Sequence, residues 1–395
     1  MSQVSLRAVS RLRLWLSPSH VSAGFVAVLV GYTSSAAIVF EAARAAGAGP
    51  AQIASWLWAL GLGMAATCIA LSWRYRAPVL TAWSTPGAAL LATALHGVSM
   101  AQAVGVFMFV SALAAIAGFS GWFEGLMHRI PRALGAGLLA GVLLEFGLGV
   151  FQVLAQQRLL VGAMLATLLL ARRLAPRYAV ALSFACGVLV AALADHWRLP
   201  QLPWQLTHPV WITPQFHWSS LLGIGLPLFV VSMASQNVPG LAMLRSHGYT
   251  TPASPLVGWT GVAGVLLAPF GGFSYNLAAI TAAICMSPEA DPDPAQRWRA
   301  AVWAGLFYGI TGLLGASVAA LFAAFPHALV AAIAGLALLS TIGNSLANAV
   351  VDESWREPAL VTFLVTASGL SLGGIGSAFW GLLLGLLTAT ITRRG

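Results

Sequence analysis

Residues 82–91 read AWSTPGAALL, a polar turn inside an apolar stretch that then resumes as a helix. Ser84 or Thr85 is a suitable N-cap, and Pro86 is tolerated in a first helical turn because its missing N–H would be unpaired there. Gly87 allows close approach to the backbone. The stretch predicts a helix that begins at membrane depth, where its unpaired N–H groups favour an anion.

A second interruption follows far downstream, where residues 271–280 read GGFSYNLAAI. Irregular backbone at membrane depth survives only where protein or a water-filled cavity satisfies its hydrogen bonds, so both interruptions should face inward. Head to head, they would form a carboxylate site; the alternative is two ordinary kinks. The expected donors are Ser84, Thr85, Gly87, Ser274, Tyr275 and Asn276. Trp83, Phe273 and Tyr32 are candidates for an apolar slot around a ring, although each also suits plain packing.

The composition is that of a polytopic all-α membrane protein. Of 395 residues, 59% are hydrophobic and 7% charged, and the mean hydropathy is +0.86. Soluble domains have about a quarter charged residues. Apolar runs of roughly 20 residues, long enough to span a bilayer, recur about fourteen times. We place the elements at 21–42, 52–73, 79–95, 101–122, 131–154, 159–171, 178–194, 219–244, 256–269, 270–286, 300–325, 329–351, 359–372 and 377–391.

The charge of +9 comes from arginine alone, and its distribution predicts topology rather than nucleic-acid binding. With both termini cytoplasmic, the external side keeps only Arg44, Arg158 and Arg198. The cytoplasmic side holds Arg7, Arg11, Arg13, Arg74, Arg76, Arg129, Arg132, Arg172, Arg173, Arg177, Arg245, Arg297, Arg299, Arg356, Arg393 and Arg394. The loop 195–218, rich in Pro, Trp and His, is expected at the external interface.

The two halves of the chain echo each other. A shift of 201 residues places RAAG at 44–47 over RSHG at 245–248, and Trp58 over Trp259. After a gap, residues 83–86 fall over 273–276. Seven elements in each half would enter the membrane from opposite sides, which predicts a 7+7 inverted repeat with half-helices at elements 3 and 10. Paired interrupted segments are the best sequence pointer to a transporter's binding site.

Residues 233–240 read MASQNVPG and place three polar side chains before a helix-distorting proline. Ser235, Gln236 and Asn237 cannot all be hidden from lipid cheaply, so they line a ligand-facing wall or bond to a neighbouring helix. The related stretch at 32–36, YTSSA, is polar too.

Two acidic residues are candidates for carrying a proton. Glu145 falls near the middle of a predicted span and must be protonated, paired or facing water. Glu41 lies three residues before Arg44, so an interfacial ion pair is the competing interpretation.

Catalytic and metal motifs are absent from the sequence. It has no Walker loop and no HExxH, and its eight histidines are scattered at span ends and loops. We therefore expect no enzyme, no cofactor and no metal, and transport that draws on an ion gradient or on the substrate's own gradient. A membrane-embedded enzyme and a non-transporting scaffold are the rival classes.

Four motifs together resemble the benzoate/proton symporter family of BenE type: AWSTPGAALL, MASQNVPG, NLAAITAAIC at 276–285 and SPEADPD at 287–293. The family is related to uracil/xanthine and sulfate permeases. The resemblance implies a cytoplasmic segment 1–20, a core domain of elements 1–4 and 8–11 (21–122 and 219–325), and a gate domain of elements 5–7 and 12–14 (123–194 and 326–395). It also implies an elevator-like movement, often in a homodimer through the gate domain.

Carried over, the family site falls on residues 84–87, on 235–237, and on Tyr275 and Asn276. Nucleobase permeases resemble one another in using acidic side chains in elements 8 and 10, whereas this chain has Gln236, Asn237 and Asn276 there. Amide donors suit a carboxylate better. We expect an inner-membrane transporter that takes up benzoate or a similar aromatic carboxylate with a proton; the alternative is a nucleobase or inorganic-anion transporter of the same fold.

Overall fold

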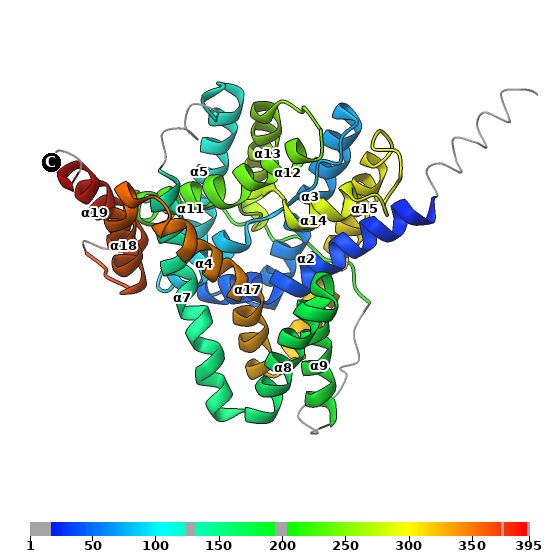
Figure 1. The fold of residues 1–395 in the computed structure, drawn as a ribbon, viewed down its shortest axis with the longest axis horizontal. Coiled ribbons are helices and arrows are strands. Elements are labelled where there is room, and N and C mark those ends of the chain that lie inside the picture. The colour runs from blue at the N-terminus through cyan, green and yellow to red at the C-terminus, as the bar shows by residue number, and fades with distance from the viewer. Residues whose placement is uncertain (1–16, 124–130, 194–203, 373–374, 393–395) are drawn as a thin grey trace, which may run out of the picture.

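The computed structural model describes residues 17–123, 131–193, 204–372 and 375–392 and is mostly helical (Figure 1). Most of the predicted segment 1–20 and the first half of the loop 195–218 lie outside these residues. The helices are α2 (Pro18–Ala45), α3 (Pro50–Tyr75), α4 (Thr85–Ala94), α5 (Met100–Phe119), α7 (Arg132–Gln156), α8 (Arg158–Leu174), α9 (Ala179–Leu193), α10 (Trp218–Ser220), α11 (Leu226–Ser232), α12 (Val238–Ser246), α13 (Ala253–Leu267), α14 (Ile280–Met286), α15 (Trp298–Leu313), α16 (Gly315–Ala324), α17 (His327–Val350), α18 (Glu353–Ala367) and α19 (Ser377–Thr392).

Two π-helical turns, η2 (Leu221–Gly225) and η3 (Met233–Asn237), join α10, α11 and α12 into one long bent helix. Two 3₁₀ turns, η1 (Pro176–Tyr178) and η4 (Ala268–Phe270), precede α9 and follow α13. Within the described residues, seven helices are long and apolar enough to cross a membrane, or eight if α15 and α16, bent by 70°, count as one. The chain is therefore a helical polytopic membrane protein, as its composition predicts.

The helices pack in two groups. In one, α3 packs on α15 and α5 on α13; in the other, α7 packs on α17 and α18, α18 on α19, and α8 on α9. Figure 1 shows α3, α5, α12 and α13 in its upper part and α7, α8 and α9 below, with α2 and α4 between them. The contacts of α4 with α7 and of α2 with α9 and α17 join the two groups.

Two short strands cross inside the first group. β1 (Thr81–Trp83) pairs antiparallel with β2 (Tyr275–Leu277), and Ala82 lies opposite Asn276. The backbone pairing continues beyond the strands, because Ser84 N–H donates to Ser274 O at 3.1 Å and Ala278 N–H to Leu80 O at 2.9 Å. The two interruptions of the sequence are thus side by side, each followed by a helix that leads away.

The two helices after the strands begin differently. α4 begins at Thr85, capped by Ser84, whose Oγ accepts a hydrogen bond from Gly87 N at 2.9 Å. α14 begins at Ile280, has only seven residues, and has no side-chain cap. Residues 275–277, expected near a helix start, are extended because they form the strand that pairs with β1.

Side chains of α3 hold the first strand in place. Ser72 Oγ donates to Val79 O at 2.9 Å, and Cys68 Sγ accepts from Thr81 N at 3.1 Å. Thr67 and Thr81 share a hydrogen bond between their hydroxyls. All of these side chains are buried. An extended segment without a full sheet must find partners for its backbone, and here a helix supplies them.

The order of elements in residues 18–193 recurs in residues 218–392. A long helix, a second helix, a strand, a short helix and four further helices follow in each part, with α16 an extra piece after α15. The first long helix ends before a left-handed glycine in both cases, Gly47 at φ 75° and Gly248 at φ 84°. These two glycines are the ones that the shift of 201 residues superimposes.

Residues 204–217 run as an irregular segment along the first group. Thr207 N donates to Leu313 O at 2.9 Å, and Ile212 N donates to Pro269 O at 2.8 Å. Its tryptophans are exposed, Trp204 at 83% and Trp211 at 61%. Exposed tryptophans beside bonded backbone are typical of a segment at a membrane–water interface.

A buried arginine organises the loop that follows α14. Arg297 donates from Nε to Asp291 O at 2.7 Å and from a terminal nitrogen to Met286 O at 2.8 Å. The Asp291 carboxylate in turn contacts Nε2 of the buried His20 at 2.8 Å. These contacts tie the end of α14 to the start of α2, two helices that border the candidate functional site described next.

Candidate functional site

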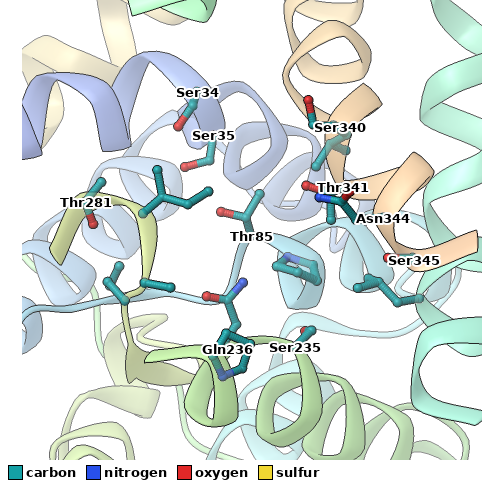
Figure 2. A pocket seen from close by; sticks show the side chains of 18 of the residues that line it. Ser34, Ser35, Thr85, Ser235, Gln236, Thr281, Ser340, Thr341, Asn344 and Ser345 are labelled. Carbon is teal, nitrogen blue, oxygen red and sulfur yellow. The ribbon is translucent and has the colours of Figure 1, made fainter. Parts of the chain in front are cut away.

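A cavity of about 1650 Å³ separates the two groups of helices. Its first wall comes from α2, the start of α4, η3 and α14, and its second wall from α7, the α8–α9 connection and α17. Figure 2 shows the polar side chains of both walls around the start of α4. The cavity is many times larger than a small aromatic acid, and we call the part of it around Thr85 and Gln236 the inner pocket.

The start of α4 forms the centre of the first wall. Thr85 and Pro86 line the cavity, whereas Ser84 and Gly87 are buried behind them and bond to each other. The Thr85 side chain makes no hydrogen bond to any residue that the structure describes. Pro86 has no N–H, and the N–H groups of Gly87 and Ala88 donate to Ser84, so the helix start offers an anion the Thr85 hydroxyl together with the positive end of the helix dipole.

Ser235 and Gln236 line the cavity from η3, and Gln236 reaches toward the start of α4 (Figure 2). The π turn has a local cause, because Pro239 lies at the start of α12 and lacks the N–H that would continue the α-helical pattern. Single π turns inside helices occur often at functional sites. Neighbouring residues lie about 100° apart around a helix, so Gln236 and Asn237 point to different sides of it.

Asn237 faces away from the cavity and into the protein. Its Nδ2 donates to Asn276 Oδ1 at 2.8 Å, and its Oδ1 accepts from Leu277 N at 2.9 Å. Asn276 in turn donates to Ser274 O at 2.7 Å, and Ser274 bonds to Ser232 at 2.6 Å. All four side chains are buried and none lines the cavity. The structure therefore brings Asn237, Ser274 and Asn276 together as a network that holds β2 against η3.

The aromatic residues proposed to line a slot for a ring lie in different places. Trp83 lines the cavity and donates from Nε1 to Ser35 Oγ at 2.9 Å, while Tyr32 packs edge-on against it at 4.9 Å between ring centres. Phe273 packs instead against Trp56 and Phe107, away from the cavity. Tyr275 is buried and donates to Ala59 O at 2.7 Å. Apolar surface in the cavity comes also from Tyr308 and from Ile280, which is 76% exposed.

The second wall contains polar residues that the sequence analysis did not single out. Ser340, Thr341, Asn344, Ser345 and Asn348 on α17 line the cavity. The spacing 340, 344, 348 places three polar side chains on one face of an otherwise apolar helix. This four-residue spacing of polar residues is the signal in the sequence that could have identified the second wall.

Three charged residues are among the described residues that line the cavity. Arg132 at the start of α7 and Arg172 near the end of α8 line it, and Asp352, which caps α18, is the only acidic residue among its described lining residues. The inner pocket around Thr85 has no carboxylate in the described lining. Such a lining favours an anionic ligand over a cationic one.

The two proton-carrier candidates lie outside the cavity. Glu41 pairs with Arg44 at 3.4 Å, three residues further along α2. Glu145 is exposed on α7, on the side that does not line the cavity. Within the described residues, no group of three or more His, Cys, Asp or Glu side chains could hold a metal ion.

The fold is that of anion transporters. The chain aligns with the transmembrane domain of a cyanobacterial bicarbonate transporter, BicA, over 96% of its length and 97% of that chain, with a TM-score of 0.55 at 14% identity. It also aligns with the inward-facing mouse Slc26a9 anion transporter, over 95% of its length and 68% of that chain, with a TM-score of 0.60 at 12% identity. At such low identity these likenesses establish the shared fold alone.

Sequence comparison gives the family. Residues 15–391 match the model of the BenE family, described as benzoate membrane transport protein. The chain is 49% identical over 370 residues to the inner membrane protein YdcO of Escherichia coli, covering 94% of this chain and 95% of that one. It is 39% identical over 371 residues to a benzoate membrane transport protein of Acinetobacter baylyi, covering 94% of each. The chain belongs to the BenE family of membrane transport proteins.

Proposed function

We propose that the protein is a proton-coupled secondary transporter that takes up benzoate or a similar aromatic carboxylate across an inner membrane. One observation carries the proposal: the inner pocket combines free hydroxyl and amide donors at a helix start with apolar side chains, and contains no carboxylate in its described lining. The carboxylate would lie against Thr85 and Gln236, and the ring against Trp83, Tyr308 and Ile280. The name of the Acinetobacter relative supports the same substrate class.

The chain is an inverted repeat of seven plus seven elements, with half-helices at α4 and α14. The recurring order of elements and the pairing of β1 with β2 support this arrangement. The ten-residue α4 contributes the stronger helix dipole, because α14 has only seven residues. Half-helices whose starts point at an anionic group are a recurring device of secondary transporters.

The first group of helices is the core domain and the second is the gate domain, with boundaries 21–122 and 219–325 for the core and 123–194 and 326–395 for the gate. Transport occurs as the core moves against the gate like an elevator, in a homodimer that joins through the gate. The cavity between the groups supports this division, and Arg132 and Arg172 in its lining support an opening on the cytoplasmic side, where this proposal also puts both termini.

Glu41 and Glu145 are the proposed proton carriers. Neither lines the cavity, so proton binding would act on the substrate site through the movement of α2 or α7. In this proposal, residues behind the cavity wall support the site: Ser84, Gly87, Asn237, Ser274, Tyr275 and Asn276. Tyr32 and Phe273 pack beside these residues. No cofactor or catalytic group takes part.

The experiment that tests the substrate class is equilibrium binding of radiolabelled benzoate to purified protein. Gln236→Glu replaces an amide donor by a carboxylate of similar shape, so it should raise the Kd at least tenfold through repulsion of the anion. Gln157→Glu makes the same change in the exposed α7–α8 turn, outside the cavity, and should leave the Kd within twofold of wild type. Equal affinity in wild type and Gln236→Glu would contradict the proposed pocket.

A further inference from the structure

The polar face of α17 lies opposite the proposed carboxylate site. Figure 2 shows Thr341 and Asn344 across the cavity from Thr85 and Gln236, with Ser340 and Ser345 on the same helix. The earlier part of the helix is different, because Leu329, Val330, Ile333 and Leu336 are buried among apolar neighbours. Polar side chains on a membrane helix are costly unless a partner helix, water or a ligand satisfies them. The second half of α17 therefore faces an aqueous or ligand-filled space.

The four asparagines of the chain fall into two kinds. The side chains of Asn237 and Asn276 are buried and bond to each other. Those of Asn344 and Asn348 are exposed and form no hydrogen bond to any residue that the structure describes. The buried pair has a structural role that explains its presence. The free amides on α17 have no such explanation inside the protein.

A carboxylate has more acceptor sites than the first wall can fill. Its two oxygens offer about four lone-pair positions. The side chains of Thr85 and Gln236 approach from one side, which leaves acceptors directed toward α17. An amide NH₂ supplies two donors and no charge, so it binds a carboxylate without the large desolvation cost of a buried cation.

We propose that α17 forms the second half of the substrate site, with the Asn344 side chain donating to the carboxylate from the gate side and Ser340 lining the same face one turn earlier. This inference rests on the proposed function. Substrate then bridges both walls, so the contact with Asn344 selects anions and joins the moving core to the gate. Asn348, one turn closer to Asp352, lies on the approach to this position.

The test uses the same benzoate-binding measurement. Asn344→Asp keeps the shape of the side chain but turns a donor into an anion, and the Kd should rise at least tenfold. Asn344→Ala removes the donor without adding charge, and the Kd should rise about threefold or more, which keeps the inference testable if the Asp variant does not fold. Gln157→Glu is the matched control for an amide-to-carboxylate change and should bind like wild type. Size-exclusion profiles and melting temperatures check that each variant is folded.

The outcomes separate this inference from the function on which it rests. If wild type binds benzoate, Gln236→Glu loses binding and both Asn344 variants bind within twofold of wild type, α17 is not part of the site and the inference is wrong while the proposed function stands. If wild type itself does not bind benzoate, both fall. Weaker binding in the Asn344 variants, with Gln157→Glu unchanged, supports the bridging site.

Discussion

Gln236 and Asn237 are neighbours in η3, yet one side chain lines the cavity and the other bonds to Asn276 inside the protein. The sequence predicted that this polar run would be inward-facing, because lipid cannot satisfy three adjacent polar groups. It could not assign each residue to the cavity or the network, since the π turn changes the rotation at that point. The sequence likewise could not tell which of Ser84 and Thr85 lines the cavity. The Ser84 hydroxyl caps its own helix by accepting from Gly87 N, whereas Thr85 lines the cavity.

Replacing Asn237 tests the structural role of the buried network. Asn237→Leu removes the acceptor for Leu277 N and the donor for Asn276, leaving two buried polar groups unpaired. Each such group costs about 1–3 kcal/mol, so we expect destabilisation of about 2–6 kcal/mol. The measurement is thermal unfolding in detergent. Equal melting temperatures for Asn237→Leu and wild type would contradict the role.

The elements that the sequence predicted well are the long apolar helices, whose length follows from the membrane they cross. The elements it missed are those set by tertiary partners. β1 and β2 are three residues each and exist because they pair with each other and because α3 supplies bonds to β1. The polar residues of α17 recur every four positions in the sequence, but they do not interrupt the helix. The search for broken helices therefore did not point to them. The start of α14 at Ile280 likewise follows from the strand before it.

Small residues set how closely the core helices approach. A Cβ on Gly61 of α3 would lie 2.5 Å from the Cα of Gly312 on α15, and one on Gly118 of α5 would lie 2.3 Å from the backbone nitrogen of Gly258 on α13. Backbone atoms cannot yield as a side chain can, so the helices must separate if a methyl group is added. Small residues at helix contacts are what membrane proteins use to gain close packing.

Gly61→Ala should therefore destabilise the protein by about 1–3 kcal/mol through overpacking. Gly149→Ala is the matched control, because Gly149 also lies within a helix, α7, but has no neighbouring atoms within 4 Å. That change should be neutral or stabilising by up to about 1 kcal/mol through helix propensity. Thermal unfolding of the two variants checks this. Similar melting temperatures for both would mean that α3 and α15 do not pack as described.

At the scale of the whole molecule, the two groups of helices and the cavity between them account for transport without any catalytic group. The sequence predicted a transporter from its composition, its internal echo and its paired interruptions, and family membership confirms that class. Which residues line the cavity depends on how the two groups of helices pack against each other. That packing is set by many contacts between residues far apart in the sequence, so no single motif reveals it. Proton coupling stays a prediction, because it would act through the movement of α2 or α7 and neither proposed carrier lines the cavity.

The most direct test of the central claim is uptake of radiolabelled benzoate into proteoliposomes with the external side acidic. We expect accumulation above that of protein-free liposomes, abolished by a protonophore and by Gln236→Glu, and displaced by unlabelled benzoate but not by uracil or sulfate. Glu41→Gln or Glu145→Gln should remove accumulation while leaving benzoate binding intact. Uptake no greater than in protein-free liposomes, or displacement by uracil or sulfate, would contradict an aromatic carboxylate carried in this cavity.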